Sequence, residues 1–225
     1  MNLQAVDEIN RKIKSACLRS HRDQSEIELL AVSKLQPVES IESAYQLGLR
    51  NFGENYVQEL NEKKKKLAHL KNATWHLIGH LQTNKVKAAI EIADVFQALD
   101  SRYLADELAR KIQNSPNPEK KLPVYIEVNI DAEENKRGLR PNELQALISR
   151  VEQLPQLQLI GLMCIPEYKK NPEDTRASYK KMRTLRDSMK SKNTLRLSMG
   201  MSSDFEVAIE EGADCIRIGP GLFGK

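Results

Sequence analysis

Short apolar runs alternate with longer amphipathic segments along the chain, and this alternation constrains the fold more than any other feature of the sequence. The predicted strands are residues 28–33, 50–52, 75–78, 94–98, 123–129, 157–163, 195–199 and 214–218. Helical patterns lie between them, near residues 38–47, 54–69, 83–92, 102–113, 141–153, 172–190 and 203–211. Strands that alternate with helices in this way are typical of a parallel sheet.

The spacing of these units favours a closed barrel. Eight predicted strands in 225 residues leave about 28 residues per unit, the compact end of a (β/α)8 barrel. An open, doubly wound sheet is the main alternative, but no G-x-G-x-x-G sequence follows the first predicted strand. A helical pattern with apolar residues from Leu3 to Cys17 precedes that strand. We therefore expect a single domain over residues 1–225, an α/β TIM-type barrel with an extra N-terminal helix.

Composition and charge exclude several classes of protein. No stretch approaches the ~20 continuous apolar residues of a membrane span, and the N-terminus lacks the basic start and apolar block of a secretory signal. A net charge of +4 and 5% aromatic residues give little support to nucleic-acid binding. The lysine run 63–66 is interpreted as a solvated helix face paired with Glu59 and Glu62. Three widely separated cysteines indicate reduced thiols and a cytoplasmic protein.

The histidines do not indicate a metal site. His76 and His80 are separated by a strand end and Gly79, so they do not share a helix face, and no acidic partner completes a zinc motif. We therefore expect no metal.

Lys34 is the first candidate for chemistry, since functional groups of such barrels lie at the carboxyl ends of strands. It follows the apolar residues 29–32, which would partly desolvate its amine. Desolvation disfavours the ammonium ion, and a neutral amine can form a Schiff base with an aldehyde. The alternative is a solvated lysine at a strand end.

Glycine-containing turns after the last two predicted strands form the second candidate. They contain Ser198-Met199-Gly200 and Gly219-Pro220-Gly221, and Ser203-x-x-Glu206 predicts a capped helix start nearby. These loops often bind phosphate in such barrels, because glycine exposes backbone N–H groups and helix N-termini favour anions. Tight turns without a ligand are the alternative.

Arg217 is the third candidate. Strand alternation places it on one face with Cys215 and Gly219. If that face is the barrel interior, the buried cation needs an acceptor such as a ring nitrogen or an acid, whereas an outward arginine would pair with a helix acid. A reactive lysine, a phosphate cradle and this arginine together describe a site for pyridoxal phosphate.

Seven ordered motifs carry a resemblance over nearly the whole chain. They are AVSKLQP (31–37), NFGENYVQE (51–59), WHLIGHLQTNK (75–85), VNIDAEENKRG (128–138), GLMCIP (161–166), LSMGMSSD (197–204) and IRIGPGLFG (216–224). In them the sequence strongly resembles the pyridoxal phosphate homeostasis protein family, which is related to the N-terminal barrel of alanine racemases.

The resemblance implies a role for each motif residue. Lys34 would be the Schiff-base lysine, and Asn55 and His80 would line the cofactor pocket. Arg217 would face the pyridine nitrogen. The remaining residues would surround the phosphate, with Ser198 and Gly219 as ligands, Met199 and Gly200 as nearby backbone, and Gly221 or water replacing the N–H that Pro220 lacks.

The implied function is non-catalytic binding of pyridoxal 5'-phosphate (PLP) in the homeostasis of this vitamin B6 cofactor and of amino acids. An arginine at the pyridine nitrogen weakens the electron sink that carbanion chemistry needs. Alanine racemases also take a second acid/base tyrosine from a further domain, which we do not expect here. We expect a monomer whose acceptors are PLP-dependent apoenzymes, with Lys136 as a candidate second amine. A PLP-dependent racemase or lyase is the alternative function.

Overall fold

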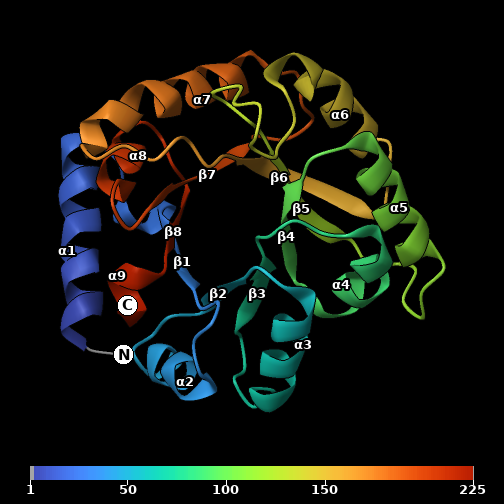
Figure 1. The fold of residues 1–225 in the computed structure, drawn as a ribbon, viewed down its shortest axis with the longest axis horizontal. Coiled ribbons are helices and arrows are strands. Elements are labelled where there is room, and N and C mark those ends of the chain that lie inside the picture. The colour runs from blue at the N-terminus through green and yellow to red at the C-terminus, as the bar shows by residue number, and fades with distance from the viewer. Residues whose placement is uncertain (1–2, 225) are drawn as a thin grey trace.

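The computed structural model describes residues 3–224, and in them eight parallel strands close into a barrel (Figure 1). The strands are β1 (Glu28–Val32), β2 (Asn51–Glu54), β3 (Thr74–Leu77), β4 (Val95–Leu99), β5 (Leu122–Glu127), β6 (Leu157–Met163), β7 (Arg196–Met201) and β8 (Cys215–Ile218). Each strand pairs with its neighbour in sequence, and β1 pairs with β8 to close the barrel. The predicted (β/α)8 fold is confirmed.

Helices surround the barrel and cover its outer face (Figure 1). They are α1 (Leu3–Arg19), α2 (Val38–Gln46), α3 (Val57–Lys66), α4 (Val86–Ile92), α5 (Arg102–Gln113), α6 (Leu144–Val151), α7 (Arg176–Ser188), α8 (Phe205–Glu210) and α9 (Pro220–Phe223). The extra N-terminal helix α1 packs along α8 and α9 on the outside of the barrel. Arg19 in its last turn forms ion pairs of 3.0 Å with Glu206 and 2.6 Å with Glu210.

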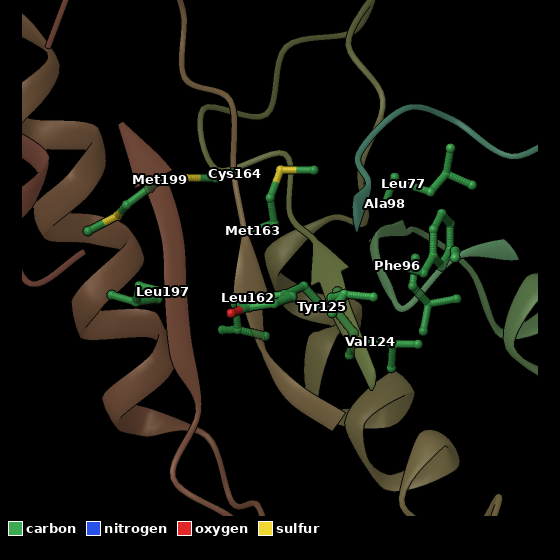
Figure 2. Close-up of a cluster of buried hydrophobic side chains, with 14 of the residues drawn as sticks. Leu77, Phe96, Ala98, Val124, Tyr125, Leu162, Met163, Cys164, Leu197 and Met199 are labelled. Carbon is green, nitrogen blue, oxygen red and sulfur yellow. The ribbon is translucent and has the colours of Figure 1, made fainter. Parts of the chain in front are cut away.

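The apolar core lies between the strands and the surrounding helices. Side chains on one face of each strand pack under the helices, as the two-residue period of a strand requires. Figure 2 shows part of this layer, in which Phe96 of β4, Leu162 of β6 and Met199 of β7 are buried among other apolar groups. No helix within residues 3–224 has the length and apolar character that crossing a membrane requires.

Element boundaries differ from the sequence prediction at two places that matter for the site. Strand β2 continues to Glu54, a charged residue that the apolar pattern did not include. The predicted cap Ser203-x-x-Glu206 is wrong, because α8 begins at Phe205 with Asp204 as its N-cap. The Asp204 carboxylate instead accepts a 2.8 Å hydrogen bond from the Met201 N–H at the end of β7.

Candidate functional site

A cavity of about 930 Å³ lies at the carboxyl ends of the strands, within the ~300–1,000 Å³ typical of small-molecule sites. The loops after β1, β2, β3, β6, β7 and β8 contribute to its lining. Four of the predicted cofactor-binding residues border it, namely Lys34, Asn55, Arg217 and Gly219. The closure of the barrel therefore brings together residues that are up to 185 positions apart, from 34 to 219.

Lys34 borders this cavity with an exposed side chain. Within residues 3–224 its amine has no hydrogen-bond or ion-pair partner. The expectation of a partly desolvated amine is therefore wrong, because the turn after β1 carries Lys34 beyond the apolar wall of the barrel. The next residue, Leu35, adopts the left-handed conformation with φ 62°, which turns the chain sharply at this point.

An ionic cluster behind this turn holds it in place. The Leu35 N–H donates a 2.6 Å hydrogen bond to Glu59 Oε1 of α3. The Lys63 amine donates to the same Glu59 oxygen at 2.6 Å, to Glu54 Oε1 at 2.9 Å and to the Ser33 carbonyl at 2.7 Å. The Ser33 hydroxyl also donates to Glu54 at 2.6 Å. These bonds fix the main chain on both sides of Lys34.

Lys63 corrects the interpretation of the lysine run as a solvated face. Its pairing with Glu59 at i, i+4 is confirmed, but its side chain is only 7% exposed and that of Glu54 is fully buried. Val57 and Leu60 lie on the buried face of α3, and Lys63 continues that face at helical spacing. This spacing was the signal that sequence reasoning missed.

Asn55 reaches the cavity from the loop after β2, next to the loop after β3. A Cβ atom at Gly79 would lie only 2.2 Å from the Asn55 carbonyl oxygen, so this close approach requires glycine. His80, the following residue, is exposed and lies 3.6 Å from Asp100. His80 is not one of the described residues that line the cavity.

Arg217 points into the barrel, as one of the two predicted orientations requires. It is only 5% exposed and borders the cavity, and its guanidinium group donates to two protein acceptors. Its Nη1 donates a 2.8 Å hydrogen bond to the Ser198 hydroxyl, and its Nη2 donates one of 2.8 Å to the Cys164 carbonyl.

The segment Ser198-Met199-Gly200 lies below the cavity, and within residues 3–224 none of its three residues belongs to the lining. Ser198 is fully buried inside the barrel, and Met199 lies in the apolar layer of Figure 2. Ser198 is the register partner of Cys215 and Met201 that of Arg217, so β7 contains one residue more than β8 between these pairs. This bulge, with Gly200 at φ 94°, carries the following residues up to the cavity.

Ser202 and Ser203 line the cavity beside the Gly219 turn, a position that the sequence prediction assigned to Ser198. The Ser202 hydroxyl accepts a 3.3 Å hydrogen bond from the Gly221 N–H. Pro220 is the first residue of α9, where the first N–H groups lack a partner within the helix, so its missing N–H breaks no helical bond. Hydroxyls and a glycine turn are suitable groups for an anion.

An apolar wall completes the cavity. Val32, Ile78, Ile165 and Tyr168 belong to it, and Tyr168 is 72% exposed at the rim. Such a wall can pack against the face of an aromatic ring, while the polar groups fix its orientation. Sequence reasoning did not select Tyr168, because one tyrosine in a long loop has no distinguishing pattern.

Glu127 and Lys136 lie at the end of β5 and in the loop after it, and neither is a lining residue of the cavity. Burial raises the pKa of Glu127, at the end of β5, to about 7, with Asp100 adding to the rise and Arg217 and Arg137 opposing it. Lys136 forms a 2.5 Å ion pair with Glu133 in the following loop. In the described part of the chain, no group of His, Cys, Asp and Glu has the arrangement of a metal site.

Comparison with known proteins gives consistent results. The sequence pattern of the alanine racemase N-terminal domain family matches residues 5–225. The pyridoxal phosphate homeostasis protein of Aquifex aeolicus is 42% identical over 223 residues, covering 98% of this chain and 96% of that protein. The human protein of the same name is 35% identical over 235 residues, covering 98% and 85%.

Solved structures add to this. PipY of Synechococcus elongatus, solved with PLP bound, has a TM-score of 0.80 and 35% identity, covering 96% of this chain and 100% of that one. Alanine racemase from E. faecalis has a TM-score of 0.69 at 17% identity and is matched over 59% of its length, so it shows similarity of fold alone.

Proposed function

Because this chain belongs to the pyridoxal phosphate homeostasis proteins, with the alanine racemase N-terminal domain, we propose that it binds pyridoxal 5'-phosphate and controls its supply. The observation that carries the proposal is the convergence of Lys34, Arg217 and the Gly219 turn on one cavity. An amine for the aldehyde, a cation for the ring nitrogen and an anion site for the phosphate are the groups that this cofactor requires.

The residues present fit the cofactor. Lys34 has a free amine and would hold the aldehyde carbon as a Schiff base. Arg217 would face the pyridine nitrogen, with Asn55 bordering the ring. We assign the phosphate group to the Gly219 turn and Ser202, because the Ser202 hydroxyl can donate a hydrogen bond and the glycine leaves room for an anion.

The other predicted site residues have supporting parts in this proposal. Ser198 holds Arg217 through its hydroxyl instead of reaching the phosphate. His80 and Gly221 lie next to lining residues, and Met199 and Gly200 shape the bulge that brings Ser202 to the cavity.

We further propose that the protein is a carrier without a dedicated reaction, serving PLP and amino-acid homeostasis. An arginine at the ring nitrogen disfavours protonation of the ring, which weakens carbanion stabilisation. The exposure of Lys34 allows another amine to approach, so PLP-dependent apoenzymes are suitable acceptors. The proposal takes residues 1–225 as one unit, monomeric and, in view of three free cysteines, cytoplasmic.

Borohydride trapping tests the proposal. Purified protein is loaded with PLP, its visible absorption is recorded before and after reduction, and the modified peptide is mapped. We expect an imine band in the wild type and in a Lys136→Ala control, with the label on Lys34, and no band in Lys34→Ala. A protein that stays colourless, or a label on another lysine, contradicts the proposal.

The same samples test the non-catalytic part. Incubation with L-amino acids should give no enantiomer or lyase product above the level of Lys34→Ala. Turnover that depends on Lys34 would instead identify a PLP-dependent racemase or lyase.

A further inference from the structure

Four buried polar side chains lie inside the barrel, beneath the cavity. His76 of β3, Gln97 of β4, Ser198 of β7 and Arg217 of β8 are each at most 5% exposed. Barrel interiors are usually filled by branched apolar residues. Burying polar groups costs free energy unless they are hydrogen-bonded to one another, so their arrangement requires an explanation.

These side chains form one hydrogen-bonded chain. Arg217 Nη1 donates to Ser198 Oγ at 2.8 Å, and the Ser198 hydroxyl donates to Gln97 Oε1 at 2.7 Å. Gln97 Nε2 lies 2.9 Å from His76 Nδ1. The chain therefore crosses the barrel from the cavity through three other strands.

Every bond in the chain has the same direction. Ser198 has a single hydroxyl proton, so it accepts from Arg217 and donates to Gln97. The Gln97 amide nitrogen can only donate, which makes His76 Nδ1 the acceptor and places the ring proton on Nε2. A neutral ring is consistent with its burial, which lowers the pKa of His76 to about 4.

The far end of the chain carries a negative charge. His76 Nε2 lies 3.8 Å from Glu28 Oε1 at the first residue of β1, and neither atom has a hydrogen-bond partner among the described residues. The other Glu28 oxygen accepts a 2.8 Å hydrogen bond from Arg196. The hydrogen bonds thus run from a cation at the cavity to the His76 ring, whose Nε2 faces a carboxylate across 3.8 Å, and bonds aligned in this way polarise one another.

This arrangement leaves Arg217 without a carboxylate partner. Within residues 3–224 no acidic group lies within ion-pair distance of it, and its protein acceptors are the neutral Ser198 hydroxyl and Cys164 carbonyl. Two acceptors fix the plane of the guanidinium group, and its other N–H groups make no hydrogen bond to the described residues of this protein, while Arg217 borders the cavity.

We propose that Gln97 is a positioning residue of the cofactor cavity, which holds the Arg217 guanidinium toward the bound ring by fixing the Ser198 hydroxyl. Gln97 is fully buried, and its hydrogen bonds connect it to Arg217 through Ser198. Without its amide oxygen, Ser198 loses its acceptor, and Arg217 loses one of the two bonds that define its plane. This inference rests on the proposed function, because it assigns the ring of PLP as the group that Arg217 faces.

Substitution of residues in the hydrogen-bonded chain, followed by titration of each variant with PLP, tests the proposal. Gln97→Met keeps the volume and removes the hydrogen bonds to Ser198 and His76, together with a 4.0 Å contact to the Cys215 sulfur, and Ser198→Ala removes one oxygen atom. Leu99→Met is the matched control, since Leu99 is a fully buried residue two positions further on the same strand. We expect both chain variants to bind PLP about tenfold more weakly, which corresponds to about 1.4 kcal/mol, and to shift the visible band of bound PLP, with the control unchanged.

Nitrogen-15 NMR of the His76 ring tests, in the absence of PLP, whether the hydrogen bond between Gln97 and His76 forms. The wild type should show a protonated Nε2 and a hydrogen-bonded Nδ1, and Gln97→Met should change the Nδ1 resonance. Should Gln97→Met fail to fold by circular dichroism, Ser198→Ala carries the affinity measurement alone.

The outcomes separate the inference from the function. Wild-type affinity and an unshifted band in Gln97→Met and Ser198→Ala overturn the positioning role while leaving PLP binding intact. A wild type that does not bind PLP overturns the proposed function, and the inference with it. An equal loss in Leu99→Met would mean that any change in the interior disturbs the site, which also overturns the specific role of Gln97.

Discussion

Replacing Lys63 by methionine removes the buried cation behind the Lys34 turn. Its amine donates to Glu54, Glu59 and the Ser33 carbonyl, and only 7% of its side chain is exposed. Methionine keeps most of the length and packing of the side chain. The change therefore reports on charge and hydrogen bonding more than on cavity formation.

The size of the effect follows from the burial of Glu54. Removing one partner of a buried ion pair costs about 3–5 kcal/mol, because the other charge stays buried without compensation. Burial is already the main influence on Glu54 and raises the pKa of its carboxyl, while Ser33 and Lys63 lower it. Proton uptake by Glu54 therefore limits the loss, and we expect about 3 kcal/mol at neutral pH or above.

The loss depends on pH in a defined direction. Without Lys63, the folded-state pKa of Glu54 rises further above the value of 4.5 that describes the unfolded chain. The folded variant then binds a proton that the unfolded chain does not, so its stability increases as pH falls toward that value. The difference from the wild type should be smaller at about pH 5.5 than at about pH 8.

Urea unfolding at both pH values, followed by fluorescence of the buried Trp75, measures the effect. Lys64→Met is the matched control, because Lys64 is adjacent on α3 and its pair with Asp94 has side chains 34% and 39% exposed. We expect the control to lose less than about 1 kcal/mol. The double variant Lys63→Met/Glu54→Gln should regain part of the loss, because the fully buried charge of Glu54 is then absent, and the Glu59 carboxylate that remains is 20% exposed and still accepts from the Leu35 N–H.

A loss in Lys63→Met no larger than in Lys64→Met would refute this reasoning. So would a loss that is the same at both pH values, because uptake of a proton by Glu54 would then have no part in it.

Three further predictions concern other parts of the fold. Gly79→Ala should lower the free energy of unfolding, measured in urea, by about 3 kcal/mol or more, because the new Cβ would lie 2.2 Å from a backbone oxygen. In the control Gly48→Ala the new Cβ meets no neighbour, so the loss should be only about 1–2 kcal/mol, which comes from the left-handed conformation of that residue. Burial lowers the pKa of His76 from 6.5 to about 4, so on acidification the unfolded chain binds a proton before the folded protein does, and the free energy of unfolding falls as the pH decreases between these values. His76→Gln should flatten this dependence of stability on pH, and an unchanged dependence would contradict a buried, neutral His76. Burial raises the pKa of Cys164 and Cys215 to about 12, so iodoacetamide should modify neither in the native protein at pH 8 and both in urea, as mass spectrometry would detect.

The sequence by itself determined the barrel and the location of the site. Periodicity distinguishes strands from helices, and strands joined by helices close in parallel, which places every strand end on one face of the fold. The positions of Lys34, Asn55, Arg217 and Gly219 at one cavity follow from that rule, together with the motifs that carry the family resemblance.

Only the tertiary structure decided which neighbouring residues lie at the cavity and which lie below it. The bulge in β7 places Ser198 below the cavity and Ser202 beside it, and one extra residue in a strand leaves no periodic signal. Lys63 is buried because its acceptors come from the turn after β1, from β2 and from its own helix, which meet only when the barrel closes. Contacts between strands distant in sequence depend on register and closure, and single-chain patterns of two or 3.6 residues carry no information about either.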